Sequence, residues 1–259
     1  MKRFLAPLMV ISAIYAVDAG ANWSFPPPLP PEEYGNLLID RTAGSWRNDL
    51  KPVSFSHWMH RRNFTCRVCH FELEFQMKAG ATEITEKANQ AGRYCGACHD
   101  GTLVFGHTPV NCEKCHNGEI GYGNSRFFQM WRFPKTRYGN QIDWCLALEE
   151  KWIEPVRFLS TPPMPDNVIG KKVELESTWS GIPPSVFPHR KHTDWLDCND
   201  CHPEVFRLRQ KATGVRMAEV LKGEFCGQCH GSVAFPLTDC VRCHPGMKSV
   251  PRYLEPVSR

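Results

Sequence analysis

The chain has 259 residues, of which 42% are hydrophobic and 13 are cysteine, and its formal net charge is +4. Its cysteine content is below the roughly 8–10% that marks a small disulfide-held scaffold, and its hydrophobic share is below the roughly 45–50% of ordinary globular domains. The low, dispersed charge excludes a basic surface for nucleic acid, so we expect no nucleic-acid partner. We also expect something other than aliphatic side chains to fill the interior.

Residues 1–21 are predicted to be an export signal. A charged start over residues 1–3 is followed by an apolar run over 4–17, and Ala19 and Ala21 offer small residues for cleavage. The alternative, a membrane anchor, needs about 20 apolar residues, more than this run contains. No later stretch approaches that length. We therefore expect an exported protein, periplasmic or extracellular, with no membrane span in its mature chain.

The mature chain is expected to begin with a proline-rich arm over residues 22–49. The stretch Pro26–Pro31 is mostly proline, and such runs adopt extended polyproline II structure. The arm is therefore predicted to be extended.

Twelve of the thirteen cysteines occur in one pattern, Cys-x-x-Cys-His, which is repeated six times. The cysteines are Cys66, Cys69, Cys95, Cys98, Cys112, Cys115, Cys198, Cys201, Cys226, Cys229, Cys240 and Cys243, and the histidines that complete the boxes are His70, His99, His116, His202, His230 and His244. Residues three and four apart lie on one face of a helical turn. Two thiols at that spacing are able to form thioethers with one porphyrin, and the adjacent imidazole is able to bind its iron. The pattern is the attachment signature of c-type haem, and it predicts six covalently bound haems c.

Three other interpretations of paired cysteines fit the pattern less well. Zinc sites use Cys-x-x-Cys pairs but do not require a histidine after each pair. Thioredoxin-like redox motifs occur singly and in a βαβ context that this sequence lacks. A disulfide framework suits an exported chain, but it gives no reason for a histidine after the second cysteine of all six pairs.

The six boxes fall into two groups of three, and the groups resemble each other. Phe55–His60 precedes the first box and Phe187–His192 precedes the fourth, each with the pattern Phe-x-His-x-x-His. The two segments and the boxes that follow them correspond through a shift of 132 residues, from 55 to 187. We therefore predict two triheme modules, over residues 50–120 and 182–248.

Residues 121–181 form a linker without a haem box, and residues 249–259 form a C-terminal tail. An amphipathic helix is predicted over Asp143–Trp152, because large apolar residues recur there at every fourth position. The odd cysteine, Cys145, lies beside that apolar stripe. Packing is its favoured role, with a reactive thiol or an intermolecular link as alternatives.

Both modules resemble a known family. A Phe-x-His-x-x-His segment followed by three Cys-x-x-Cys-His boxes is similar to the c7-type triheme module of the cytochrome c3 family. The tandem arrangement is similar to hexahaem periplasmic cytochromes of metal-respiring bacteria. The resemblance implies a mostly irregular fold with short α-helices and little β-structure, organised around haem. It also implies transfer of low-potential electrons between respiratory donors and terminal acceptors.

Six haems present twelve axial positions, and the chain holds eleven histidines. The boxes supply six of them, which leaves His57, His60, His107, His189 and His192. Four of these five occur in duplicated His-x-x-His pairs, which favours iron ligation over a core or surface role. The resemblance implies that the first histidine of each pair serves the first haem of its module and the second histidine serves the second-box haem.

The third haem of each module lacks an obvious distal ligand. Small family members place a histidine a few residues before the second box, and neither module has one there. His107 is the remaining candidate in module one. Module two offers Met217, nine residues before Cys226, although methionine is more often a core residue that fills gaps. We predict five His/His haems and one His/Met haem.

Two classes of function remain open. The first is an electron carrier whose closely spaced haems are six-coordinate, working with redox partner proteins such as other cytochromes or a membrane quinol-oxidising or outer-membrane complex. The second is a multihaem reductase of a small nitrogen or sulfur oxyanion, which needs an open iron. Because eleven of the twelve axial positions can be filled by histidine, at most one site need be open. We therefore expect a carrier and not an enzyme.

Overall fold

The computed structural model describes residues 29–40, 50–164, 170, 172–177, 179, 181–209 and 211–248. The predicted export signal, the prolines before residue 29 and the predicted tail over 249–259 lie outside the described residues. Within the described ranges, no helix has the length and hydropathy that a transmembrane segment requires.

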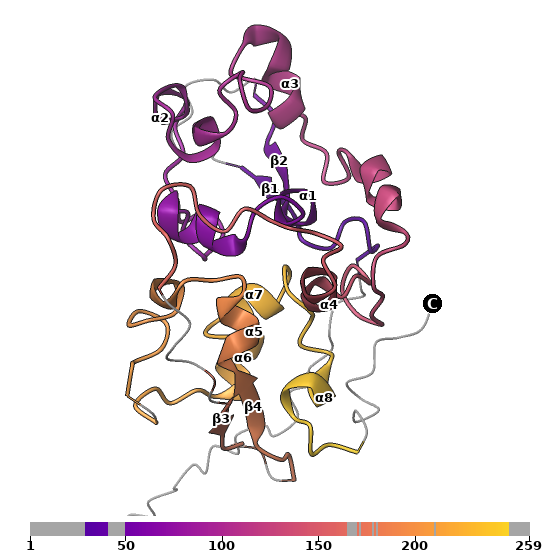
Figure 1. Cartoon of the computed structure of the whole chain (residues 1–259), viewed down its shortest axis with the longest axis vertical. Helices are drawn as coiled ribbons and strands as arrows, with labels where there is room; N and C mark the ends of the chain where they lie inside the picture. Colours follow the sequence, from indigo (N-terminus) through magenta and orange to yellow (C-terminus); the bar gives the residue numbers. More distant parts are fainter. Residues whose placement is uncertain are drawn as a thin grey trace, which may run out of the picture.

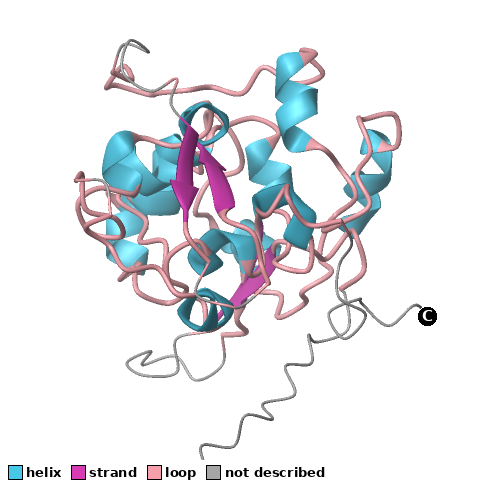
Figure 2. Cartoon of the chain, turned by 90° about the horizontal axis from the view of Figure 1, so that it is seen from below, coloured by secondary structure: helices cyan, strands magenta, loops and turns pink. Residues whose placement is uncertain are grey.

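Short elements joined by loops make up the described chain (Figures 1 and 2). The strands are β1 (Asn36–Ile39), β2 (Val53–Ser56), β3 (Lys172–Leu175) and β4 (Ser185–Pro188). The α-helices are α1 (His57–Arg61), α2 (Glu86–Gln90), α3 (Cys112–Cys115), α4 (Trp144–Glu149), α5 (His189–Thr193), α6 (Met217–Leu221), α7 (Gly227–His230) and α8 (Cys240–Cys243). Further 3-10 or π-helical turns are η1 (Val68–Glu72), η2 (Tyr94–Ala97), η3 (Pro109–Asn111), η4 (Asn124–Met130) and η6 (Cys198–Asp200). The expected fold, mostly irregular with short helices and little β-structure, is confirmed.

Each module opens with the same strand-to-helix unit. β1 pairs antiparallel with β2, and β3 pairs with β4 in the same way. β2 runs directly into α1 and β4 into α5, so the first histidine of each Phe-x-His-x-x-His motif begins a helix. The phenylalanine stays in the strand, where Phe55 lies opposite Leu37 and Phe187 lies opposite Val173. The duplicated sequence therefore folds twice into the same local structure.

The segment before module one differs from the expected arm. Residues 31–35 form a turn, and β1 then pairs along β2. The Tyr34 side chain is buried, and its hydroxyl donates to the carbonyl of Ala234 at 2.6 Å. An unpaired edge such as that of β2 leaves backbone groups without partners, and pairing with β1 satisfies them. A turn and a paired strand therefore replace the extended arm over residues 31–39.

The bridge between the modules, expected as a linker, packs against both of them. One cluster of buried side chains joins Trp58 of module one and Trp195 of module two to the bridge residues Phe127, Met130, Ile142, Trp144, Ala147 and Ile153. The guanidinium of Arg61 lies 5.4 Å from the ring of Trp144 and 5.9 Å from that of Trp195. In Figure 1, α4 lies near the middle of the molecule, between the magenta and orange parts of the chain. The two modules and the bridge therefore share one hydrophobic core.

The helix in the bridge is shorter than its periodicity predicts. α4 begins at Trp144, and the side chain of Asp143 caps it by accepting the backbone N–H of Leu146 at 3.0 Å. The helix ends before Lys151, whose φ of 59° lies in the left-handed region and interrupts the helical repeat. Trp152 is therefore outside the helix and 46% exposed.

Close packing at the second box of each module depends on glycine. Both boxes begin Cys-Gly, and the preceding helix, α2 or α6, packs against them. A Cβ added to Gly96 would lie 1.8 Å from the carbonyl oxygen of Asn89, and one added to Gly227 would lie 2.0 Å from that of Val220. Because no side chain tolerates such distances, only glycine fits at this turn of both boxes.

The substitutions Gly96→Ala and Gly227→Ala are expected to destabilise the holoprotein, because the preceding helix must move away from the box. Overpacking of this kind costs about 1–3 kcal/mol, which denaturant unfolding of the purified variants would measure. Gly214→Ala is the matched control, since a Cβ there meets nothing within 4 Å. Equal unfolding free energies for Gly96→Ala and Gly214→Ala would contradict the packing.

Candidate haem-binding site

Each Cys-x-x-Cys-His box folds as a tight turn. In five of the six boxes, the backbone N–H of the histidine donates to the carbonyl of the first cysteine at 2.8–3.0 Å. The first box continues into the π-helical turn η1 instead. A single turn brings two thiols and an imidazole to the same side of the chain, which is what attachment to one porphyrin requires.

The six box histidines share one kind of hydrogen bond. Each Nδ1 lies 2.5–3.2 Å from a backbone carbonyl oxygen, and the acceptors in box order are Phe75, Phe105, Lys51, Phe206, Phe235 and Pro183. A carbonyl oxygen only accepts, so Nδ1 carries the proton and Nε2 keeps its lone pair. That is the state a metal-binding imidazole needs, and backbone carbonyls commonly orient such ligands.

Burial favours the neutral form of these imidazoles. Desolvation lowers the pKa of His57 to about 3 and that of His230 to about 4. Burial also lowers the pKa values of His70, His99 and His192. Iron binds the neutral form of imidazole, so the surroundings of these side chains suit ligation.

Three of the upstream histidines are held in the same way. Nδ1 of His57, His60 and His192 lies 2.8, 2.8 and 3.0 Å from a backbone carbonyl, and the acceptors are Gly35, Ser56 and Pro188. His189 begins α5 as His57 begins α1. The duplicated pairs are therefore placed alike in their modules.

One phenylalanine supports both histidines of each pair. The ring of Phe55 stacks on His60 with centroids 4.4 Å apart and meets His57 edge-on at 4.9 Å. Phe187 repeats both contacts in module two, at 4.2 and 4.8 Å. Both phenylalanines belong to the duplicated Phe-x-His-x-x-His motif, and this duplication is the sequence feature that marks them as functional. Only the placed side chains show that they orient the imidazoles.

The second histidine of each upstream pair faces the histidine of the second box. The ring centroids of His60 and His99 are 6.4 Å apart, and those of His192 and His230 are 6.1 Å apart. Two imidazoles bound to one metal through nitrogens about 2.0–2.1 Å away have ring centres roughly 6 Å apart. The spacing therefore fits one iron between each pair, in the pairing that the family resemblance implies.

The two candidate ligands of the third haems lie in different surroundings. His107 is exposed in the loop between the second and third boxes, and its ring makes no hydrogen bond within the described part of the chain. Met217 begins α6 and lines the same cavity as His244 of the sixth box. Ligation by His107 and by Met217 stays a prediction.

A cavity of about 1060 Å³ is lined by residues of both modules and the bridge. Cysteines of every box except the third line it, together with aromatic side chains such as Phe55, Phe187 and Trp195. Pockets for drug-sized ligands span about 300–1,000 Å³, so this space suits groups of porphyrin size. This cavity is the part of the interior that side chains leave unfilled, and it lies beside the Cys-x-x-Cys-His boxes.

No disulfide joins any of the thirteen cysteines, all of which lie within the described residues. Burial raises the pKa of Cys69 and Cys229 to about 12 and that of Cys95 to about 11. Redox-active pairs need a thiolate and surroundings that lower the pKa, so these boxes do not have the character of a thioredoxin-like site. The pKa of Cys145 is also raised by burial, which supports the packing role.

Comparisons with known proteins agree with this site. A protein-family model described as cytochrome c7 and related cytochrome c matches residues 53–117 and 185–245, once in each module. No curated protein matches the chain. Among solved structures, a c7-type three-heme cytochrome domain is 36% identical, covers 33% of this chain and 96% of its own, and superposes with a TM-score of 0.27.

Two larger structures match across most of the chain. The C-terminal hexaheme fragment of GSU1996 is 26% identical, covering 81% of this chain and 96% of its own, with a TM-score of 0.27. The dodecaheme cytochrome c GSU1996 is also 26% identical, covering 83% of this chain and 75% of its own, with a TM-score of 0.27.

The boxes, the anchored imidazoles and the two family-model matches define a multihaem c-type cytochrome. Residues 53–117 and 185–245, one span in each module, belong to the cytochrome c7 and related cytochrome c family. Its cofactor is haem c, and its activity is electron transfer.

The His60→Ala variant is expected to convert one haem from low spin to high spin, because the iron at the second box loses the imidazole that faces His99. Electron paramagnetic resonance of the oxidised protein would detect the new signal, and added imidazole should restore the low-spin state. Arg62→Ala, an exposed change just after the same helix, is the control. An entirely low-spin spectrum of His60→Ala would contradict the pairing.

Proposed function

We propose that this protein is a hexahaem electron carrier of an exported respiratory chain, with one haem c at each box. The observation that carries the proposal is the common anchoring of the imidazoles. Nine of the eleven histidines point Nδ1 at a backbone carbonyl and leave Nε2 free. Iron-binding histidines are commonly held in this way, and anchored histidines on both sides of an iron favour a six-coordinate carrier.

Bound haem supplies a one-electron ferric/ferrous couple, and the chain supplies attachment, axial ligands and surroundings. The thiols of each box hold the porphyrin in place. With haem bound at the second box, His60 and His99 would both be ligands of its iron, and no position would remain open there for a substrate. Phe55 keeps His60 and His57 in orientation, and the apolar lining of the cavity limits the access of water. These residues thereby control ligation and potential.

Partner proteins are proposed to be other cytochromes or a membrane quinol-oxidising or outer-membrane complex. Loss of residues 1–21 would remove Lys2, Arg3 and Asp18, a net charge of +1, and change the formal charge from +4 to +3. Each haem then adds two propionates, so the holoprotein is expected to be negative overall. Partners of this carrier are therefore expected to present basic docking surfaces. Periplasmic location is part of the same proposal.

The Met217→Ala variant is expected to lower the highest midpoint potential of the protein, since methionine ligation raises the potential of haem iron. A spectroelectrochemical titration of the holoprotein would measure it. Met247→Ala is the matched control, because Met247 lines the same cavity but follows His244 by three residues and lies on its turn. Six closely grouped low potentials in the wild type, with no spectral change in Met217→Ala, would exclude the His/Met haem.

The oxidised holoprotein is expected to show six low-spin haems and no turnover of nitrite or hydroxylamine. The reason is that the eleven histidines and Met217 are proposed to fill all twelve axial positions. Pyridine haemochrome analysis would count the haems, and electron paramagnetic resonance would report their spin states. A high-spin ferric signal together with rapid turnover of nitrite would favour the reductase over the carrier.

A further inference from the structure

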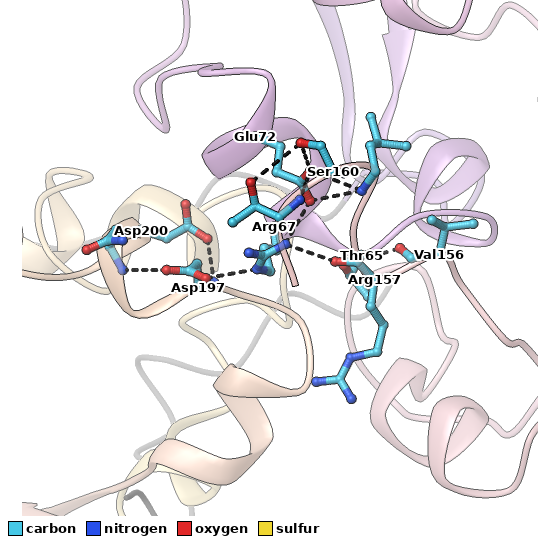
Figure 3. Close-up of polar contacts among 11 residues, drawn as sticks. Thr65, Arg67, Glu72, Val156, Arg157, Ser160, Asp197 and Asp200 are labelled. Carbon is cyan, nitrogen blue, oxygen red and sulfur yellow. Dashed lines mark hydrogen bonds and ion pairs between the residues drawn. The ribbon is translucent and has the colours of Figure 1, made fainter. Parts of the chain in front are cut away.

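The guanidinium of Arg67 lies buried between two carboxylates where the modules meet (Figure 3). Its Nε donates to Oδ2 of Asp197 at 2.8 Å, and its Nη1 donates to Oε1 of Glu72 at 2.7 Å. The three side chains are only 4–6% exposed. Because Arg67 belongs to the first box and Asp197 directly precedes the fourth, this ion pair joins one module to the other.

Asp197 is also part of the turn that carries the fourth box. Its side chain accepts the backbone N–H of Asn199 at 3.1 Å, and its own N–H donates to Oδ2 of Asp200 at 2.7 Å, which together cap η6. A second contact runs through the backbone, where the N–H of Arg67 donates to the carbonyl of Trp195 at 2.9 Å. Any displacement of Arg67 is therefore transmitted to the fourth box.

Glu72 ties the bridge to the same point. Its carboxylate accepts the backbone N–H groups of residues 159–161 at 2.7–3.2 Å. Arg67 adds a hydrogen bond to the carbonyl of Arg157 at 3.3 Å. The bridge segment thereby covers the guanidinium of Arg67. Both oxygens of each carboxylate accept hydrogen bonds.

The loop after the fifth box is held at this junction by module one. Arg61 donates to the carbonyl of Val233 at 3.2 Å, and the hydroxyl of Tyr34 donates to that of Ala234 at 2.6 Å. The backbone N–H groups of both loop residues donate in turn to the carbonyl of Cys229. Module one and the segment before it therefore contact the loop that follows the fifth box.

Thiols of the first and fifth boxes, Cys66 and Cys229, line the same cavity. Figure 1 shows α7, which carries the fifth box, near the middle of the molecule, whereas α3 of the third box lies at the upper end. Chain order alone would place the third box next to the fourth. The fold places the first box there instead.

A buried ion pair adds little net stability, because desolvation of the charges offsets their attraction. It does constrain geometry, since displacement leaves a buried charge without its partner. The pair of Arg93 and Glu74 is different. Its side chains are 59% and 75% exposed and 3.8 Å apart, and such surface pairs contribute little. The buried group around Arg67 therefore specifies how the modules fit together.

We propose that Arg67 is a positioning residue for electron transfer between the modules. By holding Asp197 and Glu72, it keeps the first box against the fourth and fifth boxes. It thereby sets the crossing point, which is the place where an electron passes from the first-box haem of module one to the fifth-box haem of module two. This inference rests on the proposed function, one haem at each box. A crossing oxidises one ferrous iron and reduces one ferric iron by a single electron, and no bond forms or breaks. The electrostatic interaction between the first-box and fifth-box haems weakens as their separation grows. The contacts of Arg67 fix that separation and therefore control the strength of the interaction.

The test is nuclear magnetic resonance of the holoprotein with assigned haems, followed through its oxidation. In the wild type we expect direct contacts between substituents of the first-box and fifth-box haems, and a redox interaction between them. Arg67→Met keeps an unbranched stem but no charge. It should retain six low-spin haems and unchanged interactions within each module, while the first–fifth interaction falls to less than half.

Arg67→Lys is expected to restore part of that interaction, because an ammonium keeps the charge but not the planar fork of donors. Arg93→Met is the matched control, an exposed arginine two residues before the second box, and should change nothing. Asp197→Asn provides a second variant if Arg67→Met does not accumulate. Its amide oxygen still caps the fourth box, while the ion pair to Arg67 is lost.

A first–fifth interaction that is unchanged in Asp197→Asn would overturn the role of the junction. A wild-type protein whose strongest contact between modules joins another pair of haems would overturn the crossing point, and this measurement needs no variant. Fewer than six haems, or a high-spin iron in the wild type, would instead count against the proposed function. The two failures are therefore distinguishable.

Discussion

The hydrogen bond from an imidazole Nδ1 to a backbone carbonyl is the constraint on which this structure depends. Four of the box histidines reach a carbonyl four to six residues further along the chain, so the loop after each of those boxes must return to its own imidazole. His116 and His244 of the third boxes differ. Their acceptors, Lys51 and Pro183, lie 65 and 61 residues earlier, at the entrance to each module. These two bonds close each module on itself.

The interior has two adjoining regions, a packed core and a cavity. The bridge core is built from tryptophan, phenylalanine, methionine and isoleucine, and it joins both modules through Trp58 and Trp195. The cavity beside the boxes is lined by cysteines and histidines of the boxes together with aromatic and aliphatic side chains, and it shares Ile142, Trp144 and Trp195 with that core. Haem faces supply the apolar surface that aliphatic side chains supply elsewhere, which explains why 42% hydrophobic residues suffice for this chain.

The modules are alike inside and different where they meet. Phe55 and Phe187, and likewise Gly96 and Gly227, have equivalent contacts in the two copies. The position of module two that corresponds to Arg67 is Asn199, so the buried ion pair exists once. Duplication explains why the two triheme modules are alike. The contact between them depends on Arg67, which is not repeated, and on the carboxylates of Glu72 and Asp197.

The sequence by itself determined the cofactor, the boxes, the two modules and the upstream histidine pairs, because covalent attachment and axial ligation need particular side chains at short, local spacings. Only the tertiary structure decided that the segment around Tyr34 folds onto both modules and that α4 ends before Trp152. It also decided that the bridge forms a shared core and that the first box meets the fourth and fifth. These features depend on contacts between residues far apart in the chain, which periodicity and local motifs do not encode.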